Sequence, residues 1–140
     1  MFNLFKKKEE PQPQSSAGLF SDLTQNQRMS VINLLALIAY GDDEGSRSET
    51  ALLSKYSNQL GVRAEASISY MEETGYETMI SDLNKLNREQ KKFLVLVSNN
   101  LIGSDGEINQ EEVAAVAGYF GDLGIDMDEY ISIVEASLRR

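Results

Sequence analysis

Two short acidic segments carry the side chains of this chain that are best suited to chemistry. Each has the spacing Asp-x-Glu-x4-Glu, and the first has one additional aspartate. Carboxylates and loop carbonyl oxygens are the ligands that hard cations such as Ca²⁺ and Mg²⁺ prefer. The spacing therefore predicts a candidate site for one of these two ions, with the metal ligands Asp42, Asp43, Glu44, Glu49, Asp105, Glu107 and Glu112.

The same carboxylates have a second interpretation, as helix caps. A carboxylate just before or inside the first turn of a helix accepts hydrogen bonds from free N–H groups and suits the positive end of the helix dipole. Both interpretations remain open on the sequence. An EF-hand is excluded, because with Gly106 at the sixth loop position the first and third positions fall on Leu101 and Gly103, which offer no side-chain oxygen.

The residues that most enzymes depend on are missing from the sequence. It has no cysteine and no histidine, which excludes thiolate chemistry, imidazole acid–base catalysis and the usual zinc sites. It also has no nucleophile elbow and no Gly-rich phosphate loop. We therefore expect a non-enzymatic binding or scaffold protein. The enzymatic alternative is a hydrolase in which a carboxylate-bound metal ion activates water.

The charge balance indicates which partners to expect. Acidic residues outnumber basic ones by 22 to 13, which gives a formal net charge of −9. Such a chain repels a phosphate backbone, and its one dense basic run is Lys6-Lys7-Lys8. We expect a protein partner and no nucleic acid.

Helical periodicity runs through the chain from Leu23 onward, and alternating strand patterns are absent. An apolar stripe starts at Val31, in a run to Tyr40 that Asn33 interrupts. The sequence predicts an all-α fold of about seven helices. N-caps are expected at Thr24 and Asn87, and stops at Gly61 and Gly124. Shorter helices are expected at Ala64–Glu73 and Tyr76–Leu83, and a last one at Met127–Leu138 with Tyr130, Ile131, Val134 and Leu138 facing inward.

The chain resembles itself at an offset of 63 residues. Leu23–Val62 aligns with Leu86–Ile125 without gaps, and nine positions are identical. Helix starts, acidic segments and the closing Leu-Gly all fall in register. We therefore expect two helix–acidic loop–helix hairpins that pack as a bundle with pseudo-twofold symmetry, because neither can bury its apolar stripe alone.

The N-terminal residues differ from the rest in composition. Both prolines lie between Glu9 and Gly18, in a stretch without large apolar residues. The sequence predicts a flexible tail at residues 1–20 and a helical domain at residues 21–140. Three apolar residues precede the lysines within residues 1–8, which allows weak, reversible contact with an anionic membrane surface. The start lacks the apolar core of a secretory signal, so we expect a cytoplasmic protein, free or peripheral at the inner face of the membrane.

The acidic segments and the helices around them resemble the TerB-like family. The similarity lies in Leu34–Tyr40 leading into Asp42-Asp43-Glu44, in Ser104–Glu112, and in the spacing to the two Leu-Gly pairs. This family is known from bacterial tellurite-resistance clusters and from a membrane-anchored DnaJ-type co-chaperone. The resemblance implies a duplicated all-helical fold, a stress-response role and acidic loops that bind ions or partners, without catalysis. The first segment departs from the family pattern, since Gly45 stands where an apolar residue is expected.

Overall fold

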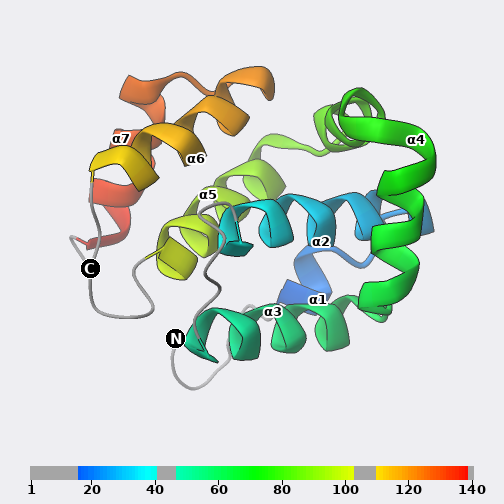
Figure 1. Ribbon diagram of the computed structural model, residues 1–140. Helices are drawn as coiled ribbons and strands as arrows, with labels where there is room; N and C mark the ends of the chain where they lie inside the picture. Colours follow the sequence, from blue (N-terminus) through cyan, green and yellow to red (C-terminus); the bar gives the residue numbers. More distant parts are fainter. Residues whose placement is uncertain (1–15, 41–46, 103–109, 139–140) are drawn as a thin grey trace.

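The computed structural model describes residues 16–40, 47–102 and 110–138 of the chain. These residues form helices joined by short connections, without a strand among them (Figure 1), which confirms the predicted all-α class. The helices are α1 (Ser16–Leu19), α2 (Gln25–Tyr40), α3 (Arg47–Leu60), α4 (Ala64–Asn84), α5 (Arg88–Ile102), α6 (Gln110–Asp122) and α7 (Met127–Leu138).

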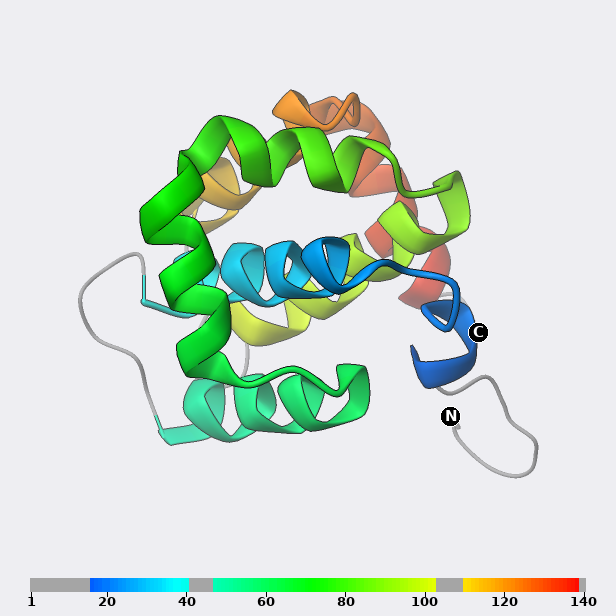
Figure 2. The same ribbon diagram turned by 90° about the vertical axis from the view of Figure 1, so that its right-hand side faces the viewer.

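Helix α2 lies at the centre of the bundle. Six consecutive residues, Ser30 to Leu35, are each at most 4% exposed. A helix buried on all sides needs neighbours all round, and α2 contacts α3, α4 and α5 (Figure 2). The sequence predicted a single buried stripe here. The burial is wider because α4 covers the face that the periodicity assigned to solvent.

The predicted N-caps are confirmed at both helix starts. The Thr24 hydroxyl accepts from the N–H of Gln27 at 3.1 Å, and the Gln27 side chain accepts from the Thr24 N–H at 2.9 Å. Asn87 and Gln90 exchange the same pair of bonds at 2.8 and 2.9 Å. These reciprocal capping boxes fix where α2 and α5 begin.

The predicted stops at Gly61 and Gly124 are also confirmed. Their φ angles are 71° and 84°, in the left-handed region that favours glycine. The next N–H groups, of Val62 and Ile125, reach back five residues to the carbonyls of Ser57 in α3 and Phe120 in α6, at 3.2 and 2.9 Å. Both helices therefore end in the same closed turn.

Cationic side chains cover these two helix ends in matching ways. The Arg28 guanidinium donates to the Leu60 carbonyl at 2.9 Å, and the Lys91 ammonium donates to the Leu123 carbonyl at 3.2 Å. Each pair ties the first helix of a hairpin to the end of the second, where a positive charge is favourable. Arg28 and Lys91 are 63 residues apart, the offset found in the sequence.

The folded domain begins earlier than the sequence predicted. Residues 16–20 were assigned to the tail, yet α1 lies within them and Phe20 is 2% exposed. The Phe20 ring packs edge-on against Phe93 at 5.6 Å between centroids. The Gln90 amide donates to the Leu19 carbonyl at 3.0 Å. Local composition gave no sign of these contacts, because they come from α5.

The inward face predicted for α7 is partly wrong. Tyr130 is 2% exposed, as expected, but Ile131 is 43% exposed and Leu138 is 77% exposed. Helix α7 lies at the edge of the bundle and packs mainly on α5 and α6. Its neighbours cover one narrow face, so the wider apolar stripe is not fully buried.

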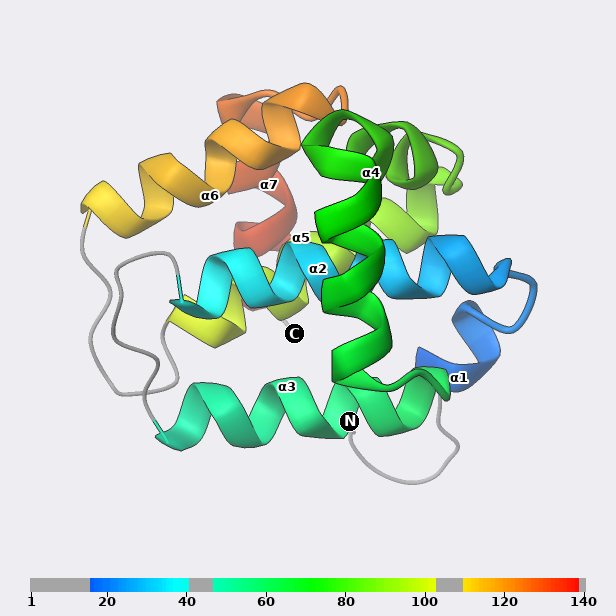
Figure 3. The ribbon, with the colours of Figure 1, turned by 45° about the vertical axis from the view of Figure 1, so that its right-hand side comes forward.

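Helix α4 is kinked at Gly75, where the sequence predicted a break between two helices. Gly75 has φ 86° and ψ 174°, and the helix continues on both sides (Figure 3). The kink bends α4 around α2. This backbone conformation is accessible essentially to glycine alone, because a Cβ clashes with the residue's own backbone.

We expect the substitution Gly75→Ala to lower the free energy of unfolding by about 2 kcal/mol. A Cβ at this position would meet no neighbouring atom within 4 Å, so the loss reports backbone strain alone. Gly118→Ala is the matched control, since Gly118 is helical, exposed and equally unobstructed. It should gain about 0.5 kcal/mol. Urea denaturation measures both, and an equal effect of the two substitutions would contradict the strain at the kink.

A buried carboxylate holds the two arms of α4 to α2. Asp82 is 9% exposed and accepts from the Ser30 hydroxyl of α2 at 2.8 Å and from the Tyr70 hydroxyl at 2.7 Å. Tyr70 precedes the kink and Asp82 follows it. The hydrogen bond to Asp82, together with burial, raises the pKa of Tyr70 to about 12 from its ordinary 10.0.

The raised pKa predicts an alkaline loss of stability. A hydroxyl whose pKa is higher in the folded state stabilises the fold below pH 10, and this contribution is lost as the pH rises toward 12. We expect the free energy of unfolding to fall over this range, and to fall less steeply in Tyr70→Phe. Urea denaturation at a series of pH values measures the slope. The same slope in both proteins would contradict the role of the Tyr70–Asp82 bond.

Candidate functional site

The seven predicted metal ligands are only partly within the described residues. Five of them lie outside: Asp42, Asp43, Glu44, Asp105 and Glu107. Glu49 lies in the first turn of α3, but its side chain is not among those that the structure describes. Glu112 alone has a described side chain, half-buried in the first turn of α6. The metal site therefore stays a prediction. Within residues 16–40, 47–102 and 110–138, no three carboxylates lie close enough to hold a metal ion.

The position of Glu112 suits the capping interpretation. It follows Glu111 in the first turn of α6, near the positive end of the helix dipole. A half-buried carboxylate at this place is stabilised by the free N–H groups of the turn. Such a carboxylate can coordinate a cation with one oxygen and accept a hydrogen bond from the helix N-terminus with the other.

The helix ends that flank the two acidic segments lie on one side of the molecule. Helices α2 and α5 run in the same general direction, and their C-terminal ends lie on the same side as the N-terminal ends of α3 and α6 (Figures 1 and 3). We call this side, formed by the ends at Tyr40, Arg47, Ile102 and Gln110, the acidic end. The fold thus attaches both segments to the same side, although they are 63 residues apart in sequence.

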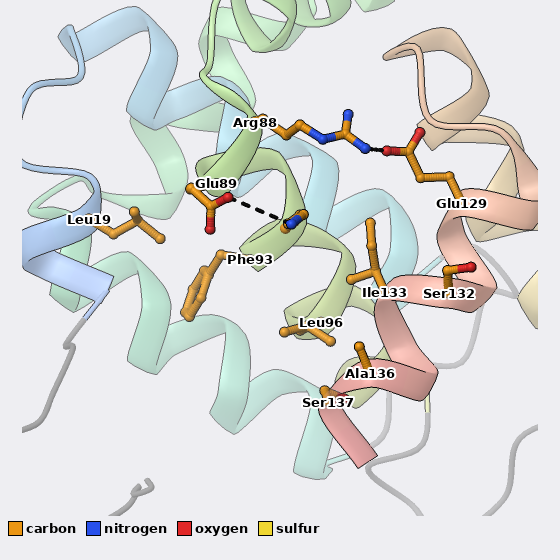
Figure 4. Close-up of a pocket in the computed structure, with 11 residues that line it drawn as sticks. Leu19, Arg88, Glu89, Phe93, Leu96, Glu129, Ser132, Ile133, Ala136 and Ser137 are labelled. Carbon is orange, nitrogen blue, oxygen red and sulfur yellow. Dashed lines mark ion pairs between the residues drawn. The ribbon is translucent and has the colours of Figure 1, made fainter. Parts of the chain in front are cut away.

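A groove lies between α1, α5 and α7, away from the acidic segments in sequence. It has a volume of about 630 Å³, and Phe93, Leu96 and Ile133 contribute apolar surface to it (Figure 4). Its rim carries an ion pair between Arg88 and Glu129 and a second pair, Lys92–Glu89, at 3.6 Å. Positive and negative charges balance here, so the groove offers apolar contact without selecting for charge.

A second cavity, of about 380 Å³, lies between α2, α4 and α6. Asn33 lines it with a side chain that is 4% exposed, and the amide nitrogen has no hydrogen-bond partner among the described residues. An unpaired buried donor costs about 1–3 kcal/mol. The sequence showed Asn33 only as an interruption of an apolar run. That interruption was the one available signal, because the cavity is formed by residues far away in sequence.

No helix in the described part of the chain is long and apolar enough to cross a bilayer. No family model, curated protein or solved structure matches this chain. The resemblance to the TerB-like family therefore stays a prediction that rests on the residues quoted for it.

Proposed function

We propose that this chain is a non-enzymatic binding module whose acidic end binds a divalent cation or a protein partner. The observation that carries the proposal is the attachment of both acidic segments to one side of the bundle. Carboxylates that lie close together repel one another, and a cation or a basic surface relieves the repulsion. The resemblance to the TerB-like family supports a bacterial stress-response role of the tellurite-resistance type, in the cytoplasm.

We further propose that the two hairpins are duplicates related by pseudo-twofold symmetry. The support comes from contacts repeated at the 63-residue offset. The capping boxes at Thr24 and Asn87, the closed turns at Gly61 and Gly124, and the cation-to-carbonyl bonds of Arg28 and Lys91 correspond one to one. Duplicated hairpins would present equivalent acidic segments, so a role of one segment is a role to test in both.

Cation binding is tested by titrating the labelled full chain with Ca²⁺, and then with Mg²⁺, while recording ¹H–¹⁵N spectra. We expect saturable shifts in residues 41–49 and 104–112, because these hold the predicted ligands. The double substitution Glu49→Gln and Glu112→Gln removes the matched carboxylates and should weaken binding by about tenfold or more. Glu65→Gln is the control, since Glu65 is exposed in the first turn of α4.

Each outcome of the titration decides between the interpretations. Shifts in only the second segment would mean that the duplication has diverged and that one cation site remains. The absence of a saturable shift below millimolar ion would exclude the cation and leave the carboxylates as helix caps or as a surface for a protein partner. Equal weakening by Glu65→Gln would mean nonspecific attraction to an acidic protein.

The alternative function is a membrane-peripheral sensor. It rests on Phe2, Leu4 and Phe5 ahead of Lys6-Lys7-Lys8, which together provide apolar and basic groups for an anionic surface. We expect the full chain to co-sediment weakly with anionic liposomes and to lose this binding when residues 1–18 are removed or the salt concentration is raised. Equal sedimentation of the full and shortened chains would exclude the alternative.

A further inference from the structure

The face of α5 that lines the groove is less covered than the same face of α2. Phe93 and Leu96 of α5 lie 63 residues after Ser30 and Asn33 of α2. Ser30 and Asn33 are 0% and 4% exposed, whereas Phe93 and Leu96 are only half-buried. The larger apolar side chains are thus on α5, where they are less protected from water. An apolar surface of this kind is expected to have an occupant.

The second arm of α4 provides the cover of α2. This arm, residues 76–84, directly precedes the second hairpin, and its side chains Met79 and Leu83 are at most 1% exposed. Asp82 of the arm accepts the hydrogen bond from Ser30 of α2 at 2.8 Å. A segment that comes immediately before one hairpin therefore covers the face of the other.

The corresponding segment before the first hairpin is residues 13–21, at the 63-residue offset. The structure describes its last part, α1 and the turn after it, and the Phe20 ring packs on Phe93 of α5. Helix α1 is four residues long, and the groove lies between it and α7 (Figure 4). Residues 1–15, which precede α1, are attached at this edge of the groove, because Leu19 of α1 lines it.

The groove is lined by apolar side chains from three helices. Figure 4 shows Phe93 and Leu96 of α5 between Leu19 of α1 and Ile133 and Ala136 of α7. The volume of about 630 Å³ has room for about twenty non-hydrogen atoms, at about 30 Å³ for each water-sized group. That is the size of a few large apolar side chains rather than of a whole helix.

The start of the chain supplies such side chains in Phe2, Leu4 and Phe5. In a helix Phe2 and Phe5 share a face, and in an extended chain Phe2 and Leu4 do, so either conformation presents two of them to a groove. Residues 6–15, between Phe5 and α1, span up to about 35 Å when extended, which is ample for a groove that begins at α1. The tether also gives the segment an effective concentration in the millimolar range, so a weak contact is enough.

The charges outside the groove favour the lysines that follow Phe5. Asp128 and Glu135 of α7 are exposed, and neither forms an ion pair within the described part of the chain. They lie one turn before and one turn after Ser132, which lines the groove. The basic residues of the rim are already paired with glutamates, so they leave these carboxylates to Lys6-Lys7-Lys8. A second copy of the chain fits this face less well, because two chains of net charge −9 repel each other.

We propose that the groove between α1, α5 and α7 is the docking site of this chain's own residues 2–8, with Phe2, Leu4 and Phe5 in the groove and the three lysines against the acidic residues of α7. The segment completes on α5 the cover that the second arm of α4 provides on α2. Side chains held in the groove are not available to a lipid surface, so this contact opposes the membrane contact of the alternative function. The proposal rests on the proposed duplication and uses none of the seven predicted cation ligands, so the Ca²⁺ titration and the test below can fail separately.

The contact is measured with a nitroxide attached at Asn3→Cys in the labelled full chain, which has no other cysteine. We expect the backbone amides of Lys92 and Ala136, which line the groove, to lose half of their intensity or more relative to the chemically reduced label. The reason is that the tethered segment occupies the groove most of the time. Glu72 of α4 lines the other cavity, and its amide should be unaffected.

Substitutions in the segment show which side chains hold it. Phe2→Ser and Phe5→Ser together should abolish the broadening of the groove amides, because they remove the aromatic rings from the segment. Gln12→Ser and Gln14→Ser are the matched control, since they change two polar residues between the segment and α1. The broadening should remain as it is in the chain without them.

Substitutions on α7 show whether the groove is the surface that the segment contacts. Ala136 is exposed and lines the groove, so Ala136→Arg fills the groove without disturbing the core and should also abolish the broadening of Lys92. Ile131→Arg is the control on the same helix, at a position that is 43% exposed and does not line the groove. It should leave the broadening unchanged.

Three outcomes contradict the proposal. One is the absence of broadening at Lys92 and Ala136 in the full chain. Another is broadening that persists with Phe2→Ser and Phe5→Ser, or that Ala136→Arg and Ile131→Arg change equally, since the label would then only be near the groove by virtue of its tether. The third is equal broadening in a ¹⁵N-labelled chain without nitroxide that is mixed with the nitroxide-bearing chain at natural isotope abundance. This result would mean that the segment docks on a second copy.

Discussion

The packing of α2 against α5 determines how the other helices are arranged. Val31 and Leu35 of α2, Leu60 of α3 and Leu94 and Val97 of α5 surround a space of only about 10 Å³, too small for more than one water molecule. This close fit fixes the direction of both helices. Since they run in the same general direction, the segments that follow them leave the bundle on the same side.

Buried polar groups join the remaining helices to this pair. Asp82 accepts hydrogen bonds from both α2 and the far arm of α4, and Gln90 joins α5 to the turn before α2. An apolar contact between helices tolerates small rotations, whereas a buried hydrogen bond does not. Asn33 differs from these residues because it is buried without such a bond. The hydroxyls of Ser57 and Ser98 are buried without a partner among the described residues as well.

Features set by neighbouring residues could be predicted from the sequence, and features set by distant residues could not. The caps at Thr24 and Asn87 and the turns at Gly61 and Gly124 follow from residue types a few positions apart, and all four are confirmed. The burial of Phe20 depends on Phe93, and the exposure of Ile131 on how many helices reach α7. Periodicity measures an apolar stripe but not how many neighbours will cover it.

The candidate site shows the same division. The spacing of the carboxylates is visible in the sequence, and so is the offset that relates the two acidic segments. That both segments attach to one side follows from the α2–α5 packing, which no local pattern contains. Most of the predicted ligands lie outside the described residues, so the cation itself stays a prediction.

The placement of the flanking helix ends on one side of the molecule can be measured directly. The chain has no cysteine, so Glu111→Cys, at an exposed position in the first turn of α6, accepts a single nitroxide label. We expect strong paramagnetic broadening of the amides of Tyr40 and Arg47, at the ends of α2 and α3, and little at Leu60, at the opposite end of α3. Broadening of Leu60 with Tyr40 and Arg47 unaffected would place the segments on different sides and contradict the acidic end.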